Sequence, residues 1–161
     1  MDLSIHSLED LLLAALKGEV DSSEVYIKLS ERVKNAFLKD KLKFLAGEEE
    51  KHKTFIESLY KDNFPNKEIV VPKKTSVPLP EIKLDVPISE VIKSAMEAEK
   101  AAYDFYNALS GKFENDSAIK RTLVYLAIME MGHYKLLELE KETIDKYEDY
   151  DSVWPMVHLG P

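Results

Sequence analysis

Two short motifs with the same internal spacing constrain the fold of this chain more than any other feature. A glutamate precedes a histidine by three residues in the segment EEEKH and again in MEMGH, and a single glutamate lies upstream of each motif. The six residues are Glu19, Glu49, His52, Glu99, Glu130 and His133. Each residue of the first set is followed by its counterpart 80 or 81 residues later. We infer a two-helix unit that occurs twice.

The surrounding residues have the spacing of amphipathic helices. Apolar residues continue from each motif residue in alternating steps of three and four, as in Leu42, Leu45, Glu49, His52 and Ile56. Residues with this spacing share one face of a helix, and that face packs into the core. Every residue of the pattern therefore occupies a position where an apolar side chain is expected.

Buried carboxylates at these positions require a compensating charge. An ionised carboxylate in an apolar interior is strongly penalised unless it is paired or coordinates a metal. A single buried histidine is more often a hydrogen-bonded packing residue than a ligand, but six residues in one register favour a metal site. Two divalent cations would neutralise four glutamates, and neutral imidazoles add ligands without charge. Carboxylate and imidazole ligands suit iron, manganese and zinc, so the sequence does not select among these metals.

The repeat also selects among three consecutive acidic residues. Glu48 and Glu49 both lie within one turn of His52, but the second motif has methionines, Met129 and Met131, on either side of its glutamate. By register Glu49 is the predicted ligand. The flanking carboxylates are expected to face solvent.

The expected fold is all-α, within a single domain spanning residues 1–161. Helices are predicted at 8–34, 36–62, 88–113 and 116–147, with Ser7 and Asp10 at the first helix start and Asn35 resembling a helix end. The segment 63–87 is too rich in proline to be helical and is predicted to be an extended strap. A 26-residue helix is about 39 Å long, and about 25 extended residues can cover that length. The third helix can therefore run parallel to the second, which gives a ferritin-like four-helix bundle with one long crossover between helices 2 and 3.

Composition excludes several other classes. The net charge of −8 argues against a nucleic-acid partner, and no apolar run approaches the roughly 18 residues of a membrane span. The acidic start is unlike a signal peptide, so a cytoplasmic protein is expected. The chain has no cysteine, which removes iron–sulfur ligation and thiol chemistry. Its lack of glutamine and its excess of Lys and Glu are typical of thermophile proteins.

The tail, residues 148–161, is expected to pack on the bundle or on a neighbouring subunit.

Four segments of the chain resemble the rubrerythrin family. They are KGEVDSSEVYIKLSERV, LKFLAGEEEKHKTFIESLY, SAMEAEKAAYDFYNALS and LAIMEMGHYKLLELE. The resemblance implies that the six residues of the repeated pattern hold two irons. It also implies that Tyr26 and Tyr106 hydrogen-bond ligand carboxylates and assist catalysis, although an ordinary aromatic core is the alternative for both.

The chain departs from classical members of that family in two ways. Those members carry a rubredoxin-like domain with four cysteines, whereas this chain has none, so a separate electron donor such as rubredoxin is expected. They also carry an additional glutamate in the third helix, where this chain has Ala102. The redox-linked exchange of iron ligands that the family uses is therefore not implied here.

The leading functional prediction is a di-iron oxidoreductase, peroxidase-like, that reduces hydrogen peroxide or oxygen in oxidative-stress defence. One alternative is a ferroxidase and iron-storage protein, which would require a large hollow assembly. The other is a metal-binding bundle without turnover. The chain is expected to form a homo-oligomer, most simply a dimer.

Overall fold

The computed structural model describes residues 3–75, 77, 80 and 82–147. These residues form four long helices and one short 3₁₀ turn. The helices are α1 (Leu8–Arg32), α2 (Ala36–Asn63), α3 (Ile88–Ser110) and α4 (Ser117–Lys146). The turn η1 (Gly111–Phe113) directly follows α3. The prediction for the tail lies outside the described residues.

Local capping explains where α1 and α2 begin. Ser7 caps α1, because its side chain accepts a hydrogen bond from the backbone N–H of Asp10. Asn35 was expected at a helix end, but it caps the start of α2 and accepts from the N–H groups of Phe37 and Leu38. Helix α1 consequently ends at Arg32, two residues before its predicted end. Helix α3 ends at Ser110 rather than at residue 113, since the chain tightens into η1.

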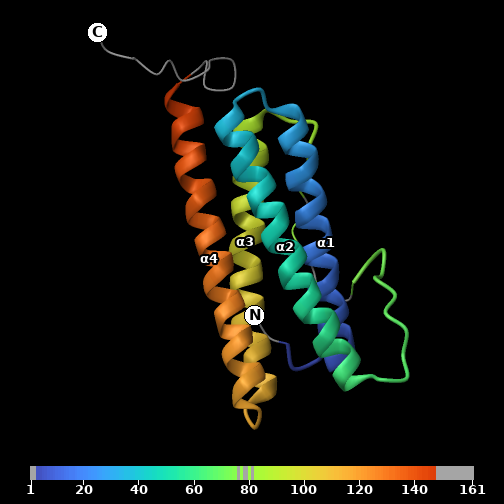
Figure 1. Ribbon diagram of the computed structural model, residues 1–161. Coiled ribbons are helices and arrows are strands. Elements are labelled where there is room, and N and C mark those ends of the chain that lie inside the picture. Colours follow the sequence, from blue (N-terminus) through green and yellow to red (C-terminus); the bar gives the residue numbers. More distant parts are fainter. Residues whose placement is uncertain (1–2, 76, 78–79, 81, 148–161) are drawn as a thin grey trace.

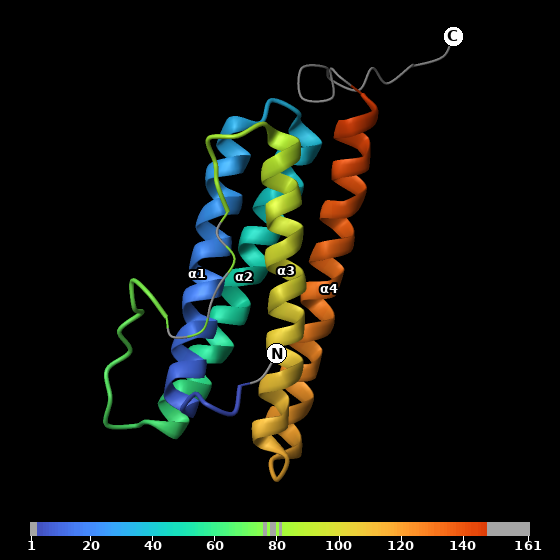
Figure 2. The same cartoon turned by 180° about the vertical axis from the view of Figure 1, so that it is seen from behind.

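The helices form a bundle of two antiparallel hairpins, α1–α2 and α3–α4 (Figure 1). The long connection after Asn63 leaves one end of α2 and returns to the opposite end of the bundle before α3 begins (Figures 1 and 2). Helices α2 and α3 therefore run parallel. This arrangement confirms the predicted ferritin-like bundle with one long crossover between the second and third helices.

The core consists of two apolar layers. One layer includes Leu12, Leu16, Ile56, Leu109 and Leu123. The other includes Leu29, Leu38, Leu42, Ile92 and Leu137. Along α1 and α2, the Glu and His residues of the repeated pattern lie between these two layers. Apolar side chains therefore flank them toward both ends of the bundle.

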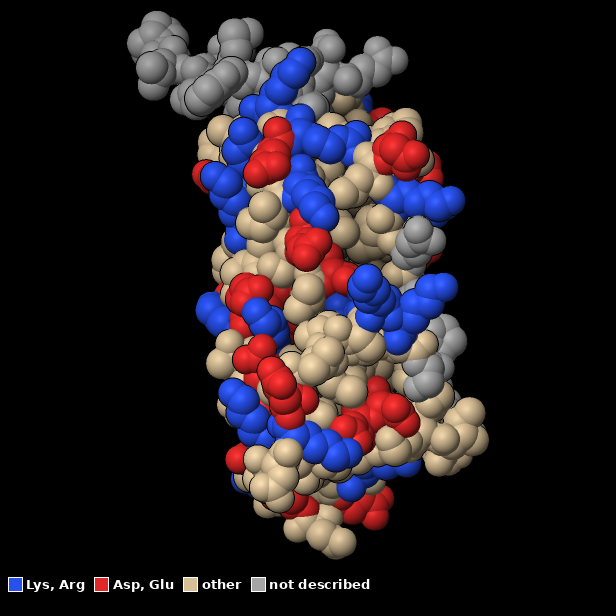
Figure 3. Space-filling view, turned by 90° about the vertical axis from the view of Figure 1, so that its right-hand side faces the viewer, with Lys and Arg blue, Asp and Glu red and all other residues tan. Residues whose placement is uncertain are grey.

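The outer surface carries charges of both signs. Lys and Arg alternate with Asp and Glu over the face shown in Figure 3, without a continuous basic patch on that face. Among the described residues, no helix has both the length and the apolar character that are needed to cross a membrane.

Candidate metal centre

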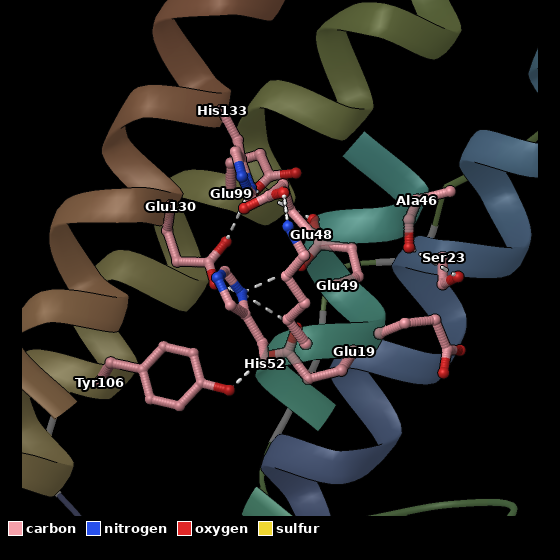
Figure 4. A network of polar contacts seen from close by, with 12 residues as sticks. Glu19, Ser23, Ala46, Glu48, Glu49, His52, Glu99, Tyr106, Glu130 and His133 are labelled. Atoms are coloured by element: carbon pink, nitrogen blue, oxygen red, sulfur yellow. Dashed lines mark hydrogen bonds and ion pairs between the residues drawn. The ribbon is translucent and has the colours of Figure 1, made fainter. Parts of the chain in front are cut away.

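The structure brings all six residues of the repeated pattern together in the middle of the bundle (Figure 4). Helix α1 contributes one glutamate and α3 another, while α2 and α4 each contribute a Glu-x-x-His pair. Every one of these side chains is buried, with at most 4% of its residue surface exposed: Glu19, Glu49, His52, Glu99, Glu130 and His133. Four helices therefore supply one enclosed cluster of oxygen and nitrogen atoms.

The first half of the cluster surrounds Nδ1 of His52. This nitrogen lies 2.8 Å from Glu130 Oε1, 3.3 Å from Glu49 Oε2 and 3.6 Å from Glu19 Oε2. One ligand atom from each of these four residues lies within 4.8 Å of the others. The group has the composition of a metal site with three carboxylates and one imidazole.

The second half surrounds Nδ1 of His133 in the same way. This nitrogen lies 3.2 Å from Glu49 Oε1, 3.5 Å from Glu99 Oε2 and 3.5 Å from Glu130 Oε2. The two imidazole rings are stacked, with centroids 5.5 Å apart and planes 17° from parallel. The cluster therefore contains two equivalent groups side by side.

Two of the glutamates belong to both groups. Glu49 directs Oε2 toward His52 and Oε1 toward His133. Glu130 directs Oε1 toward His52 and Oε2 toward His133. Each of these carboxylates can therefore bridge two cations, whereas Glu19 and Glu99 each belong to a single group.

Unpartnered buried atoms provide a test of whether cations fit this cluster. Glu49 Oε1, Glu130 Oε1, both Nδ1 atoms and His133 Nε2 are buried and meet no hydrogen-bond criterion within the described part of the chain. The two oxygens and the two Nδ1 atoms face one another inside the groups, with Glu130 Oε1 2.8 Å from His52 and Glu49 Oε1 3.2 Å from His133. The donor set and its unmet coordination capacity therefore fit two divalent cations.

Burial and mutual repulsion perturb the carboxylates in the metal-free form. Burial, reinforced by the charge of Glu130, raises the pKa of Glu19 well above its ordinary value. Burial and the charge of Glu49 raise the pKa of Glu99 in the same way. The pKa of Glu130 moves in the opposite direction, because the two imidazoles outweigh its burial and lower it to about 2.

The imidazoles respond to the same carboxylates. Burial alone would lower the pKa of His52, but Glu130, Glu19 and Glu49 outweigh it and raise the pKa to about 12. For His133 the carboxylates of Glu130, Glu49 and Glu99 likewise outweigh burial and raise the pKa to about 12. Protons therefore occupy the imidazoles at neutral pH when no cation is bound.

Two tyrosines contact the carboxylates that belong to single groups. The hydroxyl of Tyr26 donates a hydrogen bond to Glu99 Oε1, and the hydroxyl of Tyr106 donates to Glu19 Oε1. Both tyrosines are buried, and burial together with the adjacent carboxylate raises the pKa of each well above 10. Each phenol therefore remains a hydrogen-bond donor at neutral pH.

The neighbouring glutamates form ion pairs outside the cluster. Glu48 pairs with Lys51, and Glu50 lies 3.0 Å from Lys53. The Glu48 side chain is only 13% exposed, so the expectation that it faces open solvent is wrong. Its position on α2 places it near the bundle surface, where the lysine compensates its charge.

One buried carboxylate was missed by the sequence analysis. Glu140 lies seven residues after His133 on the same face of α4, is 4% exposed and forms an ion pair with Lys41 of α2. Its helical spacing was a usable signal for burial. However, Glu140 pairs with a lysine and does not contribute to the carboxylate and imidazole cluster.

A four-helix bundle with one Glu from each of two helices and Glu-x-x-His from the other two defines the ferritin-like carboxylate proteins that hold two metal ions. The Rubrerythrin family model matches residues 10–141, and this chain belongs to that family. A solved structure of a hypothetical protein from Pyrococcus furiosus is 36% identical in sequence, with a TM-score of 0.78. That similarity covers 90% of this chain and 94% of the Pyrococcus furiosus chain. A search of curated proteins finds no match.

Proposed function

We propose that this protein is a di-iron oxidoreductase that reduces peroxide or oxygen with electrons from a separate donor. The observation that carries the proposal is the pair of four-residue groups that share Glu49 and Glu130. Membership of the rubrerythrin family supports iron as the metal. In this proposal the electrons come from a separate donor of the rubredoxin class.

Two irons, when bound, supply the electron pair that cleaves an O–O bond. Glu49 and Glu130 would hold both ions, because each presents one oxygen to each group. Tyr26 and Tyr106 orient the remaining two carboxylates through their hydroxyl groups. The apolar layers on either side close off the cluster toward both ends of the bundle.

Anaerobic reconstitution with Fe(II) tests the metal assignment. About two irons per chain are expected for a paired site. The variant Glu49→Gln should lose most of this capacity, because one shared carboxylate oxygen becomes an amide nitrogen. Glu50→Gln is the matched control, since that side chain pairs with Lys53 outside the cluster. A stoichiometry near zero or one iron for the wild type would contradict a two-metal centre.

The reaction itself requires a second measurement. The reduced protein should consume hydrogen peroxide when reduced rubredoxin is supplied, and Glu130→Ala should abolish this activity. A protein that holds two irons but reacts only with oxygen, without turnover of peroxide, would support the ferroxidase alternative. A protein that binds two metals and reacts with neither oxidant would support a bundle without turnover.

A further inference from the structure

A cavity of about 310 Å³ lies between α1, α3 and the crossover, and it reaches the candidate metal centre. Glu19, Glu49 and Glu130 line its buried end. Asp21, Glu24 and Lys28 line it farther along α1, where the side chains are exposed. The cavity therefore connects the surface of the bundle to the carboxylate cluster.

Small residues on the two helices create this space. Gly18 on α1 and Ala98, Ala101 and Ala102 on α3 all line the cavity. A Cβ atom added at Gly18 would meet no other atom within 4 Å, so this part of α1 faces open space rather than a packed neighbour. Larger side chains at these positions would fill the cavity, which makes its volume a direct consequence of the sequence.

Described residues of the crossover cover one side of the cavity, because Val77, Pro80, Ile82 and Leu84 line it. Val77 is only 2% exposed. Arg32 secures the far end of the crossover by donating hydrogen bonds to the carbonyl oxygens of Leu84 and Val86. The cover is therefore attached to the end of α1.

The chemistry of the walls differs from one end of the cavity to the other. Apart from the charged residues the lining is largely apolar and includes Val25, Ile82 and Phe105. At the buried end, the carboxyl residues Glu19, Glu49 and Glu130 supply the polar groups. Such a site matches a molecule with an apolar body and one small polar group that reaches the metal centre.

Size separates this ligand from the smallest oxidants. By the same measure as the cavity volume, one water molecule needs about 10–15 Å³, so the cavity has room for a molecule of ten or more non-hydrogen atoms. Hydrogen peroxide and oxygen have only two such atoms, so neither would fill the cavity. An alkyl chain would transfer its apolar surface from water into the cavity, which is favourable in proportion to the area buried.

We propose that the preferred substrate of this site is an alkyl hydroperoxide, with its chain in the cavity and its O–O bond at the metal centre. This inference rests on the proposed function. In the overall reaction, the hydroperoxide ROOH takes two electrons from the external protein donor and two protons from solvent. The O–O bond breaks, and the products are the alcohol ROH and water.

Binding to metal-free protein tests the cavity independently of catalysis. The probe is 1-nonanol, an unreactive alcohol with ten non-hydrogen atoms. Triethylene glycol is the matched control, because it has the same number of non-hydrogen atoms but a polar chain. Amide resonances of Gly18 and Ala102 should shift in two-dimensional NMR spectra on addition of 1-nonanol and not on addition of triethylene glycol. Equal responses to both, or no response to 1-nonanol, would overturn the proposal.

Kinetics of the iron-loaded protein test the substrate class. The ratio of kcat/KM for n-octyl hydroperoxide to kcat/KM for hydrogen peroxide should be ten or more in the wild type. Gly18→Leu and Ala102→Leu should each lower this ratio about tenfold by filling the cavity. Gly47→Leu on α2 is the matched control, because Gly47 lies outside the cavity and also has free space around a new Cβ. Its ratio should equal that of the wild type.

The two assays distinguish failure of the inference from failure of the proposed function. Two bound irons and turnover of hydrogen peroxide, with no preference for the octyl compound, would overturn the alkyl substrate and leave the di-iron function standing. Binding of 1-nonanol to the metal-free protein, together with failure of that protein to take up iron on reconstitution, would overturn the di-iron function and, with it, the substrate assignment. Binding of 1-nonanol together with an unaltered ratio in both leucine variants would overturn the cavity as the substrate site.

Discussion

The hydroxyl group of Tyr26 on α1 donates a hydrogen bond to Glu99 on α3, which belongs to the other helical hairpin. The reciprocal bond runs from Tyr106 on α3 to Glu19 on α1. Each hairpin therefore orients a carboxylate that the other hairpin contributes to the cluster. The geometry of the candidate metal centre depends on correct docking of the two halves, and not only on the folding of each hairpin.

Removing the Tyr26 hydroxyl is expected to weaken metal binding. The change Tyr26→Phe keeps the ring but leaves Glu99 without its donor. Loss of such an orienting partner typically costs about 10–100-fold in metal affinity, and loss of a buried hydrogen bond costs about 1–3 kcal/mol of stability. Competition with a chelator and chemical denaturation measure the two effects. Tyr125→Phe is the control, because Tyr125 is 59% exposed. Equal metal affinities for the two variants would show that the Tyr26–Glu99 hydrogen bond does not orient a ligand.

Metal removal is expected to lower the melting temperature. Cations that bind only the folded state stabilise it by about 2.7 kcal/mol when their concentration is 100 times Kd. Calorimetry of metal-loaded and metal-free protein measures this difference. A variant with glutamine in place of Glu19, Glu49, Glu99 and Glu130 keeps the side-chain shapes but lacks the anionic ligands, so its melting temperature should not respond to metal. Identical melting of the loaded and metal-free wild type would refute the prediction.

Metal affinity is expected to increase with pH. In the metal-free form the pKa of His52 and that of His133 are both about 12, so both imidazoles carry a proton at neutral pH. A cation must displace these protons to bind the ring nitrogens. Each displaced proton adds about one unit of log affinity per pH unit, so the two imidazoles alone give a slope of roughly two between about pH 6 and 8. The sign follows from the raised pKa, because protonation competes with the metal at every pH below it.

Titration of Mn²⁺ against a chelator at several pH values measures this slope. Calorimetry in buffers of different ionisation enthalpy counts the released protons directly. Release should exceed two protons if Glu19 and Glu99, whose pKa values are also raised, hold protons before metal binds. An affinity that does not change with pH would show that the imidazoles are neutral in the metal-free protein.

The helical spacing was sufficient to predict the bundle and its crossover. Steps of three and four placed Glu49 and His52 on the same face as Leu45 and Ile56, and in the structure all four side chains are buried. The helix ends were less accurate, because capping depends on single residues. Asn35, for example, can end one helix or begin the next, and only its hydrogen bonds show that it begins α2.

Other features of the site depend on how the helices dock. The pattern named Glu19 and Glu49 alike as ligands, yet Glu49 contacts both histidines whereas Glu19 contacts His52 alone. The spacing of Tyr26 from Glu19 on the same helix did not indicate that its partner is Glu99. These relationships arise between helices, and the positions of residues along one helix do not specify them.

The last prediction concerns Ala102, which lies three residues after Glu99 on the same side of α3 and lines the cavity beside Glu19 and Glu130. The change Ala102→Glu would place another carboxylate next to the candidate centre and would also occupy the cavity. Turnover of hydrogen peroxide should rise several-fold, because an additional anionic ligand can support an oxidised metal pair. Turnover of n-octyl hydroperoxide should fall, because the new side chain takes the space of the alkyl chain.

The control is Ala102→Gln, which fills the same volume without the charge and should lower the octyl activity without raising the peroxide activity. Stopped-flow oxidation and steady-state consumption, with rubredoxin as donor and iron content measured for each variant, separate the two effects. Equal peroxide turnover in the two variants would show that charge at this position does not contribute to catalysis. Undiminished octyl turnover in both would place the alkyl chain elsewhere.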